Sequence, residues 1–452
     1  GMAFNVFEEQ GSDIGFMRTL FILLVVGMLL FGCVMIYSAS APSAVAEGSH
    51  PAVYLLDQLK FALIGIVAAV GAWCIPYRVW LGRAANVVWF LGMALVVLTM
   101  FSGAGGDTWG AQRWLVLGPI SLQSSEFMKI AIAIVAAKIM SEYHSGILEF
   151  KEAICKAFVL VGVPMLLILK TQSDLGTTMI IFAAVIVVMW LGEVPIPIVV
   201  GLIVAAAGLA VLATVFSSYR SSRFLYLDPW NDGKGGYGAG YQIIHSYYAF
   251  SQGGLFGVGI GNSTEKYLYL PESETDFIYS VIGEELGMFG ALAVLVACIV
   301  LGYAGLRIAY AAEDDFGCML AGSLTVMLVV QAFLNMGSAA GLLPTTGKPL
   351  PFISSGGSSL IATFIMVGLV LSVSQGSASF SLPFGGGKKG DVYEQRRDNL
   401  RVIHVDGAAD SGHRASGSSR RTSFLDESSM SGSFGNTSSS SRLSRRTRNA
   451  RR

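Results

Sequence analysis

Long apolar runs recur along this 452-residue chain, and they restrict the fold more than any other feature. A helix needs about 20 apolar residues to cross the hydrocarbon core of a bilayer. Ten runs approach that length, at residues 18–39, 53–75, 84–101, 127–140, 153–169, 175–191, 195–216, 277–304, 316–335 and 360–373. We therefore predict an all-α polytopic membrane protein with ten transmembrane helices and a large extracytoplasmic loop, residues 217–276, between helices 7 and 8.

Composition supports a membrane protein and excludes several classes of cofactor. Only 13% of the residues are charged, against about 25% in typical soluble proteins. The five cysteines are scattered singly and the five histidines lack metal-ligand spacing, so we expect neither a disulfide framework nor a zinc site. We also expect no haem and no nucleotide cofactor.

The chain divides into three predicted parts. Residues 1–14 form a cytoplasmic N-terminal segment, 15–378 a membrane domain, and 379–452 a disordered basic tail rich in serine and arginine. From Phe384 to Arg452 there are 14 Lys or Arg against 7 Asp or Glu. A basic tail of this kind suits the anionic cytoplasmic leaflet. The last part of the tail has almost no interleaved aromatic residues, which argues against nucleic-acid binding.

The positive-inside rule then orients the chain in a plasma membrane. With ten helices and a cytoplasmic tail, the N-terminus is cytoplasmic too. The outer side receives residues 41–51, 102–126, 170–174, 217–276 and 338–359. Because the unusual polar motifs all fall in or next to these segments, we predict one extracytoplasmic site.

Two motifs flank the start of the fourth predicted helix. Arg113 lies beside Trp114 and could clamp a phosphate with its planar guanidinium. Glu126 and Lys129 are three residues apart, so they share one helix face and could form an ion pair. An aromatic belt with an interfacial ion pair is an equally good interpretation.

Further polar residues precede or occupy the other outer loops. Asp174 stands at the mouth of the sixth helix, where capping of the helix N-terminus is the preferred interpretation. Arg220 and Arg223 could bind an anionic head group or simply lie on a solvated face. Gln242 follows in the same loop, before a glycine-rich stretch at 253–261.

An acidic cluster immediately precedes the eighth helix. Glu272, Glu274 and Asp276 place three carboxylates beside the apolar run that begins at Phe277. Ionisable groups at such depth usually face a cavity and have a function. A capping box between Ser273 and Asp276 is the structural alternative. On a continuous helix, Glu284 would lie about 80° around from Asp276, which makes it a candidate to support Asp276.

The loop before the tenth helix combines three prolines with small polar residues. Its Gly347-Lys348 pair superficially resembles a phosphate-binding loop, but Pro349 replaces the required Ser or Thr and no strand precedes it. Prolines between apolar runs indicate a non-helical backbone beside protein or a wet cavity. Candidate site residues here are Lys348, Ser354, Ser355 and Ser358.

Together these motifs resemble the SEDS family (shape, elongation, division and sporulation proteins) over nearly all of residues 15–378. The resemblance depends most on Pro271–Ile278 and Pro349–Ser359. Residues 228–230, 259–263 and 282–287 resemble the division branch more than the elongation branch. The chain departs from the family pattern at Ser125 and Ser173, where proline is usual, at Glu274, often histidine, and at Ser355, commonly tyrosine.

The resemblance implies a peptidoglycan glycosyltransferase that polymerises lipid II on the outer face of the plasma membrane. Its implied partners are a class B penicillin-binding protein, which supplies transpeptidation, and other division proteins. Asp276 is implied to be the general base that deprotonates the acceptor 4-hydroxyl. That oxygen then attacks the anomeric carbon of the lipid-linked donor and expels undecaprenyl pyrophosphate.

The other candidate residues then take supporting roles. Glu272, Glu274 and Glu284 would tune or position the base. A divalent cation, Mg²⁺ or Mn²⁺, could assist, although its ligands are not identified. Candidates to stabilise the pyrophosphate charge are Arg113, Lys129, Arg220, Arg223 and Lys348.

Three alternatives remain open at this point. An elongation-type polymerase would share the chemistry. A lipid II flippase or other transporter would also have many helices and buried polar residues, but its acids should lie near the midplane of the membrane. A structural scaffold would leave the polar outer motifs without a role.

Overall fold

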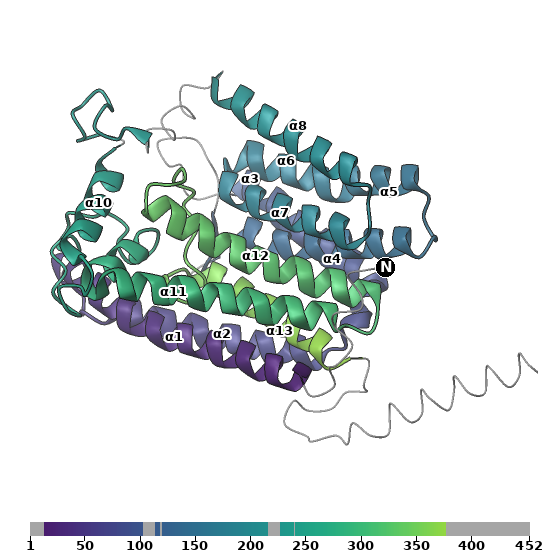
Figure 1. Cartoon of the computed structure of the whole chain (residues 1–452), viewed down its shortest axis with the longest axis horizontal. Helices are drawn as coiled ribbons and strands as arrows, with labels where there is room; N and C mark the ends of the chain where they lie inside the picture. Colours follow the sequence, from purple (N-terminus) through teal and green to yellow (C-terminus); the bar gives the residue numbers. More distant parts are fainter. Residues whose placement is uncertain (1–12, 103–113, 118–119, 216–226, 239, 377–452) are drawn as a thin grey trace, which may run out of the picture. The chain divides into compact units, whose positions relative to one another are not determined.

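The helices of the computed structural model run side by side across the molecule (Figure 1). The structure describes residues 13–102, 114–117, 120–215, 227–238 and 240–376. Two units divide the chain, Gly1–Gly385 and Gly386–Arg452, and every described residue belongs to the first. The predicted tail and most of the predicted N-terminal segment lie outside the described residues.

The helices follow the predicted apolar runs closely. The α-helices are α1 (Asp13–Ala46), α2 (Val53–Cys74), α3 (Arg83–Ser102), α4 (Ser124–His144), α5 (Phe150–Ala157), α6 (Val163–Thr171), α7 (Leu175–Leu191), α8 (Ile196–Val215), α10 (Tyr241–Gly253), α11 (Ile278–Tyr310), α12 (Asp315–Ala339) and α13 (Gly357–Ser374). A 3₁₀ helix, η2, spans Tyr77–Leu81, and a π-helical turn, η3 (Phe158–Gly162), joins α5 to α6. Each predicted run therefore coincides with a helical segment.

Seven of the described helical segments are long and apolar enough to cross a membrane. They are α1, α2, α3, the continuous segment Phe150–Thr171, α11, α12 and α13, whereas α7 and the described apolar part of α8 are shorter apolar helices. These helices give a largely helical fold with many possible crossings. Several helices also extend beyond the apolar runs: α11 ends at Tyr310 rather than at residue 304, and α12 ends at Ala339 rather than at residue 335. A helix can continue past the residues that would lie in the hydrocarbon.

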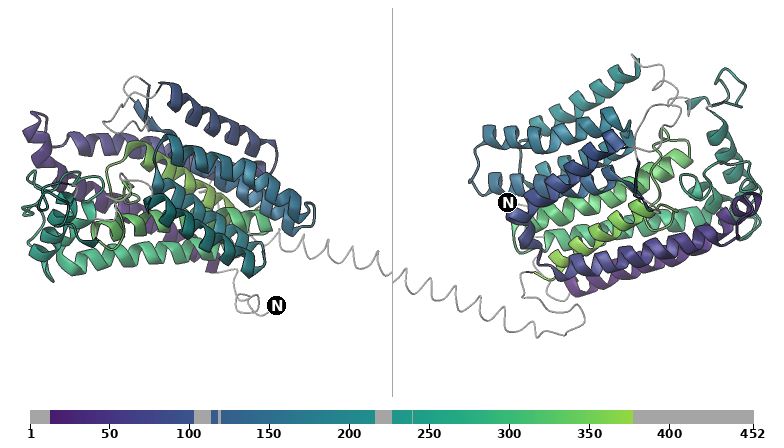
Figure 2. Two further views of the ribbon diagram at one scale, coloured as in Figure 1. Left: turned by 90° about the horizontal axis from the view of Figure 1, so that it is seen from above. Right: turned by 180° about the vertical axis from the view of Figure 1, so that it is seen from behind.

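The centre of the fold is formed by α12 and α13. In their apolar windows, 72% and 78% of the residues are buried inside the protein, compared with 17% in α2 and 22% in α3. Figure 1 and the rear view in Figure 2 place α8 at one edge of the helix array, and α1 and α2 at the opposite edge. Polar residues on α12 and α13 therefore contact protein rather than lipid.

A short hairpin leads directly into α4. Strand β1 (Trp114–Leu117) pairs antiparallel with β2 (Ile120–Gln123), with Trp114 opposite Gln123. The helix α4 begins at the next residue, Ser124. The hairpin therefore leads into the start of α4, where two of the candidate charged residues lie.

The long helix α11 is interrupted near its start. Gly287 has a φ of 68° and a ψ of −165°, which are not helical. The amides of Val258 and Gly259 donate to carbonyls of α11 before the break, and the amide of Met288 donates to the carbonyl of Gly254. These bonds satisfy backbone groups that the break leaves without helical partners.

Candidate functional site

The predicted ion pair near the start of α4 is present. Lys129 Nζ lies 2.6 Å from Glu126 Oε2, and both side chains are fully buried. Lys129 Nζ also donates to Oε1 of Gln331 in α12, at 2.8 Å. Since the pair faces α12 rather than lipid, it is part of the protein interior and not of an interfacial belt.

The predicted capping role of Asp174 is confirmed, and the carboxylate has further hydrogen-bond partners. It is the N-cap of α7, since its Oδ1 accepts a hydrogen bond from the amide of Thr177. Its Oδ2 accepts from the hydroxyls of Thr177 and Ser125, at 2.8 and 2.9 Å, and from Nε2 of Gln123 at 3.1 Å. The serine that departs from the family pattern at 125 thus supplies a donor that a proline could not.

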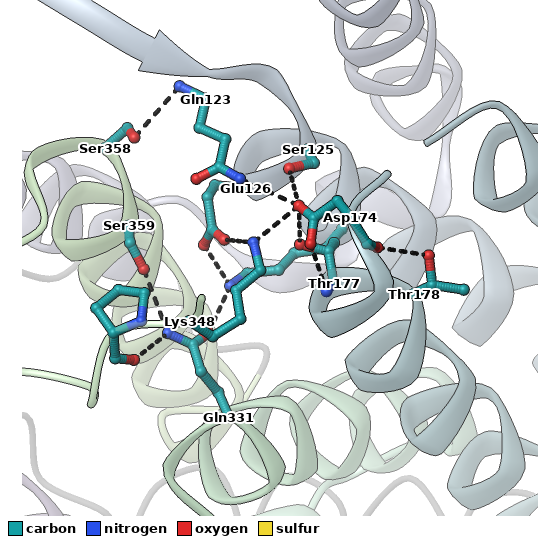
Figure 3. A network of polar contacts seen from close by, with 12 residues as sticks. Gln123, Ser125, Glu126, Asp174, Thr177, Thr178, Gln331, Lys348, Ser358 and Ser359 are labelled. Carbon is teal, nitrogen blue, oxygen red and sulfur yellow. Dashed lines mark hydrogen bonds and ion pairs between the residues drawn. The ribbon is translucent and has the colours of Figure 1, made fainter. Parts of the chain in front are cut away.

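Lys348 joins the two acids into one network (Figure 3). Its Nζ lies 2.9 Å from Glu126 Oε1 and 2.9 Å from Asp174 Oδ2. Burial alone would favour neutral side chains, but attraction between this ammonium and its two carboxylate partners outweighs it. The pKa of Asp174 is therefore well below its ordinary value and that of Lys348 above it.

Charge in the network is balanced. Two lysines and two acids are each within ion-pair distance of a partner, and Lys348 is only 2% exposed. Both ammonium groups already bind buried carboxylates. A direct contact of Lys129 or Lys348 with pyrophosphate stays a prediction. Their observed contacts hold the start of α4, the start of α7 and the loop 340–356 together.

Gln331 is a member of this network that the sequence interpretation missed. Its Nε2 donates to the carbonyl of Pro349, at 3.0 Å, and to the hydroxyl of Ser359, at 3.2 Å. The signal available was a carboxamide in the middle of an otherwise apolar helix, where unpaired polar groups are costly.

The serine-rich loop before α13 contacts the acidic segment. Ser354 Oγ donates to the carbonyl of Thr275 at 2.7 Å, and the amide of Ser355 donates to the carbonyl of Glu274 at 2.9 Å. Ser358 Oγ instead accepts from the amide of Gln123, at 3.3 Å. Two distant motifs that the sequence placed on one side of the membrane are therefore in direct contact.

The structural alternative for the acidic cluster, a capping box between Ser273 and Asp276 at the start of the helix, is wrong. The helix α11 begins at Ile278, and its N-cap residue, Phe277, has no side-chain cap. The carbonyl of Glu272 accepts from the amides of Thr275 and Phe277 instead. These bonds fold the acidic segment into turns, so Asp276 precedes the helix.

Asp276 itself is partly exposed. A Cβ built at Gly347 would lie 3.7 Å from Asp276 Oδ2, so the carboxylate lies close to the residue before Lys348. Partial burial raises the pKa of the Glu274 carboxyl, two residues before Asp276. Hydrogen bonds to that carboxyl lower its pKa, the charge of Glu272 raises it, and the net shift is upward.

Two other predicted residues lie in or contact the outer loop. Glu284 accepts hydrogen bonds from the amide of Thr264, at 2.7 Å, and from the hydroxyl of Ser263. The helical-wheel argument that paired it with Asp276 does not apply, because Asp276 is not on the helix. Gln242 is half-buried on the first turn of α10.

The three predicted arginines, Arg113, Arg220 and Arg223, lie outside the described residues. Within the described ranges, no group of three or more His, Cys, Asp or Glu side chains could hold a metal ion. A cation such as Mg²⁺ is commonly bound by one or two carboxylates together with substrate phosphates. The described side chains do not form a complete cage, and the role of a divalent cation stays a prediction.

Comparison with known proteins identifies relatives across most of the chain. The sequence model of the FtsW, RodA and SpoVE family, described as cell cycle protein, matches residues 18–379. A probable peptidoglycan glycosyltransferase FtsW from Trichlorobacter lovleyi is 38% identical over 356 residues, which cover 78% of this chain and 92% of the relative. The stage V sporulation protein E of Bacillus subtilis is 36% identical over 359 residues, covering 79% and 96%.

Solved structures are also similar to this chain. A chain from a peptidoglycan synthase complex, studied for its coordination of polymerization and crosslinking, is 25% identical with a TM-score of 0.63. A mutant of the rod shape determining protein RodA from Thermus thermophilus is also 25% identical, with a TM-score of 0.57. Each comparison covers 78% of this chain and 96% of the solved chain.

Proposed function

Because the chain belongs to the FtsW, RodA and SpoVE family of multi-pass membrane proteins, we propose that it is a division-type peptidoglycan glycosyltransferase. Lipid II is the proposed substrate and glycan strands are the product. Relatives named as probable peptidoglycan glycosyltransferases support this proposal. The hydrogen bonds that anchor the acidic segment to the loop before α13 support it as well.

That anchoring is the observation on which the proposed mechanism depends. The carbonyls of Glu274 and Thr275 accept hydrogen bonds from the loop before α13, while Asp276 stays partly exposed. A fixed backbone with an accessible carboxylate is what a general base requires. A residue that only capped a helix would not need this support from a second loop.

In the proposed reaction, Asp276 accepts the proton of the acceptor 4-hydroxyl. The freed oxygen forms a bond to the anomeric carbon of the lipid-linked donor, and the bond from that carbon to undecaprenyl pyrophosphate breaks. The pyrophosphate leaves with the negative charge, so the proton remains on Asp276 until it is released. The network at Lys348 acts behind this centre by holding the loop that contains Gly347.

The proposal includes topology and partners. Ten crossings place both termini in the cytoplasm and the acidic segment on the outer face. The solved peptidoglycan synthase complex coordinates polymerization with crosslinking, which supports a class B penicillin-binding protein as the crosslinking partner. Other division proteins would recruit the pair.

A direct assay distinguishes a polymerase from a lipid carrier. The full chain, with and without its penicillin-binding partner, is reconstituted in vesicles that hold labelled lipid II only in the leaflet facing the acidic segment. We expect glycan strands to form there. Movement of lipid II across the bilayer without strand formation, in the presence of the partner, would contradict the proposal and favour the flippase.

A further inference from the structure

Asn335 is a fully buried carboxamide on α12 that contacts both loops of the candidate site. The residue is 1% exposed. Its Nδ2 donates to the carbonyl of Asp276 at 2.9 Å and to the carbonyl of Lys348 at 2.8 Å. One side chain therefore joins the backbone of the proposed base to the backbone of the lysine in the buried network.

The chemistry of these two bonds explains why the residue is an asparagine. Both acceptors are carbonyl oxygens, and a carboxamide nitrogen has two N–H groups that can each donate to one of them. Reversal of the amide would place Oδ1 against two carbonyl oxygens, so the observed orientation is the favourable one. The other end of the amide, Oδ1, is buried and has no hydrogen-bond partner among the residues that the structure describes.

An unpaired buried acceptor is costly, and such groups in native structures usually have a reason. Here the cost accompanies two bonds that no apolar residue could replace. The same two loops also touch through Ser354 and Thr275, at 2.7 Å. The contacts of Asn335, however, are with Asp276 and Lys348 themselves.

We propose that Asn335 is a positioning residue that fixes the backbone of Asp276 against the loop of Lys348. The inference rests on the proposed function and adds a residue that acts through the base. Loss of the two bonds releases Asp276 from the geometry needed for proton transfer, without removing any group that touches substrate. A misplacement of about 1 Å can lower turnover by about 100-fold.

Kinetics of a double-mutant cycle test this role. The full chain is compared as wild type, Asn335→Ala, Asp276→Asn and the double variant, with lipid II as substrate and the partner present. We expect Asn335→Ala to lower kcat by at least about tenfold, with little change in KM. In the Asp276→Asn background, the same change should leave the residual turnover unaltered, because the group that it positions is already gone.

A merely structural role gives a different result. A smaller folded fraction lowers turnover by the same factor in both backgrounds, and that outcome would overturn the inference. Wild-type turnover in Asn335→Ala would overturn it as well.

Hydrogen exchange provides a readout that does not depend on activity. We expect amides in residues 271–277 and 344–352 to exchange faster in Asn335→Ala than in the wild type. The matched control is Ser338→Ala, because the hydroxyl of Ser338 donates only within its own helix, to the carbonyl of Asn335. Equal exchange in the wild type, Asn335→Ala and Ser338→Ala would refute the positioning role, even if the wild type made no polymer. Failure of the wild type to polymerise lipid II would refute the proposed function alone.

Discussion

At the scale of single residues, the buried ions matter because of how they are paired. Lys348 has two carboxylate partners, whereas Asp174 has Lys348 as the cation within ion-pair distance. Glu126 has a second cation in Lys129. Removing Lys348 would therefore leave Asp174 as the uncompensated charge, and a buried charge without a partner is costly.

We predict that Lys348→Met destabilises the protein by about 3–5 kcal/mol. The additional change Asp174→Asn should recover part of this loss, because it removes the uncompensated carboxylate while an amide oxygen still caps α7. Thermal unfolding of the purified variants in detergent measures both effects. Simple addition of the two single losses would show that the residues do not interact as described.

The residue scale also shows what sequence alone can predict. The Glu126–Lys129 pair was predictable because both residues lie on one helix, three positions apart. The contact between Asp174 and Lys348 was not predictable, since these two residues are separated by 174 positions and meet through helix packing. Gln331 and Asn335 stand out as polar residues in an apolar helix. A sequence pattern does not identify their partners, because these lie in other elements: Lys129, Pro349 and Ser359 for Gln331, and the carbonyls of Asp276 and Lys348 for Asn335.

At the scale of elements, the apolar runs predicted helices well and predicted their first turns poorly. The acidic segment matched a capping box, yet the carbonyl of Glu272 accepts from the amides of Thr275 and Phe277, and the helix begins only at Ile278. The interruption of α11 at Gly287 was also not predicted. It depends on backbone bonds to a loop that lies about thirty residues earlier in the chain, and hydrophobic periodicity contains no information about such bonds.

The break in α11 requires a glycine at position 287, and this requirement can be tested. A Cβ at Gly287 would lie 2.4 Å from the backbone nitrogen of Gly257, and its φ of +68° is strained for other residues. We predict that Gly287→Ala destabilises the protein by about 1–3 kcal/mol. The control is Gly71→Ala in α2, where nothing lies within 4 Å, and where alanine should be neutral or slightly stabilising. Equal unfolding temperatures for the two variants would contradict this account of the break.

At the scale of the whole molecule, the fold brings segments from distant parts of the sequence to one site. The acidic segment, the loop before α13 and the first turns of α4 and α7 are joined by hydrogen bonds or ion pairs, either directly or through α12. The sequence predicted that these motifs share one side of the membrane, because the number of helices between them fixes their side. The buried centre of α12 and α13 supplies the rigid support that the exposed loops themselves lack.

The central claim is that Asp276 is the base in strand polymerisation, and one comparison tests it most directly. Wild type, Asp276→Asn and Asp57→Asn are each supplied with labelled lipid II and the partner, and strand formation is measured over time. Asp57 is a matched control, because it is an acid on α2 whose side chain is 51% exposed and paired with Lys60. We predict that Asp276→Asn folds normally and loses at least about 100-fold in rate, while Asp57→Asn polymerises like the wild type. Undiminished strand formation by Asp276→Asn would contradict the account.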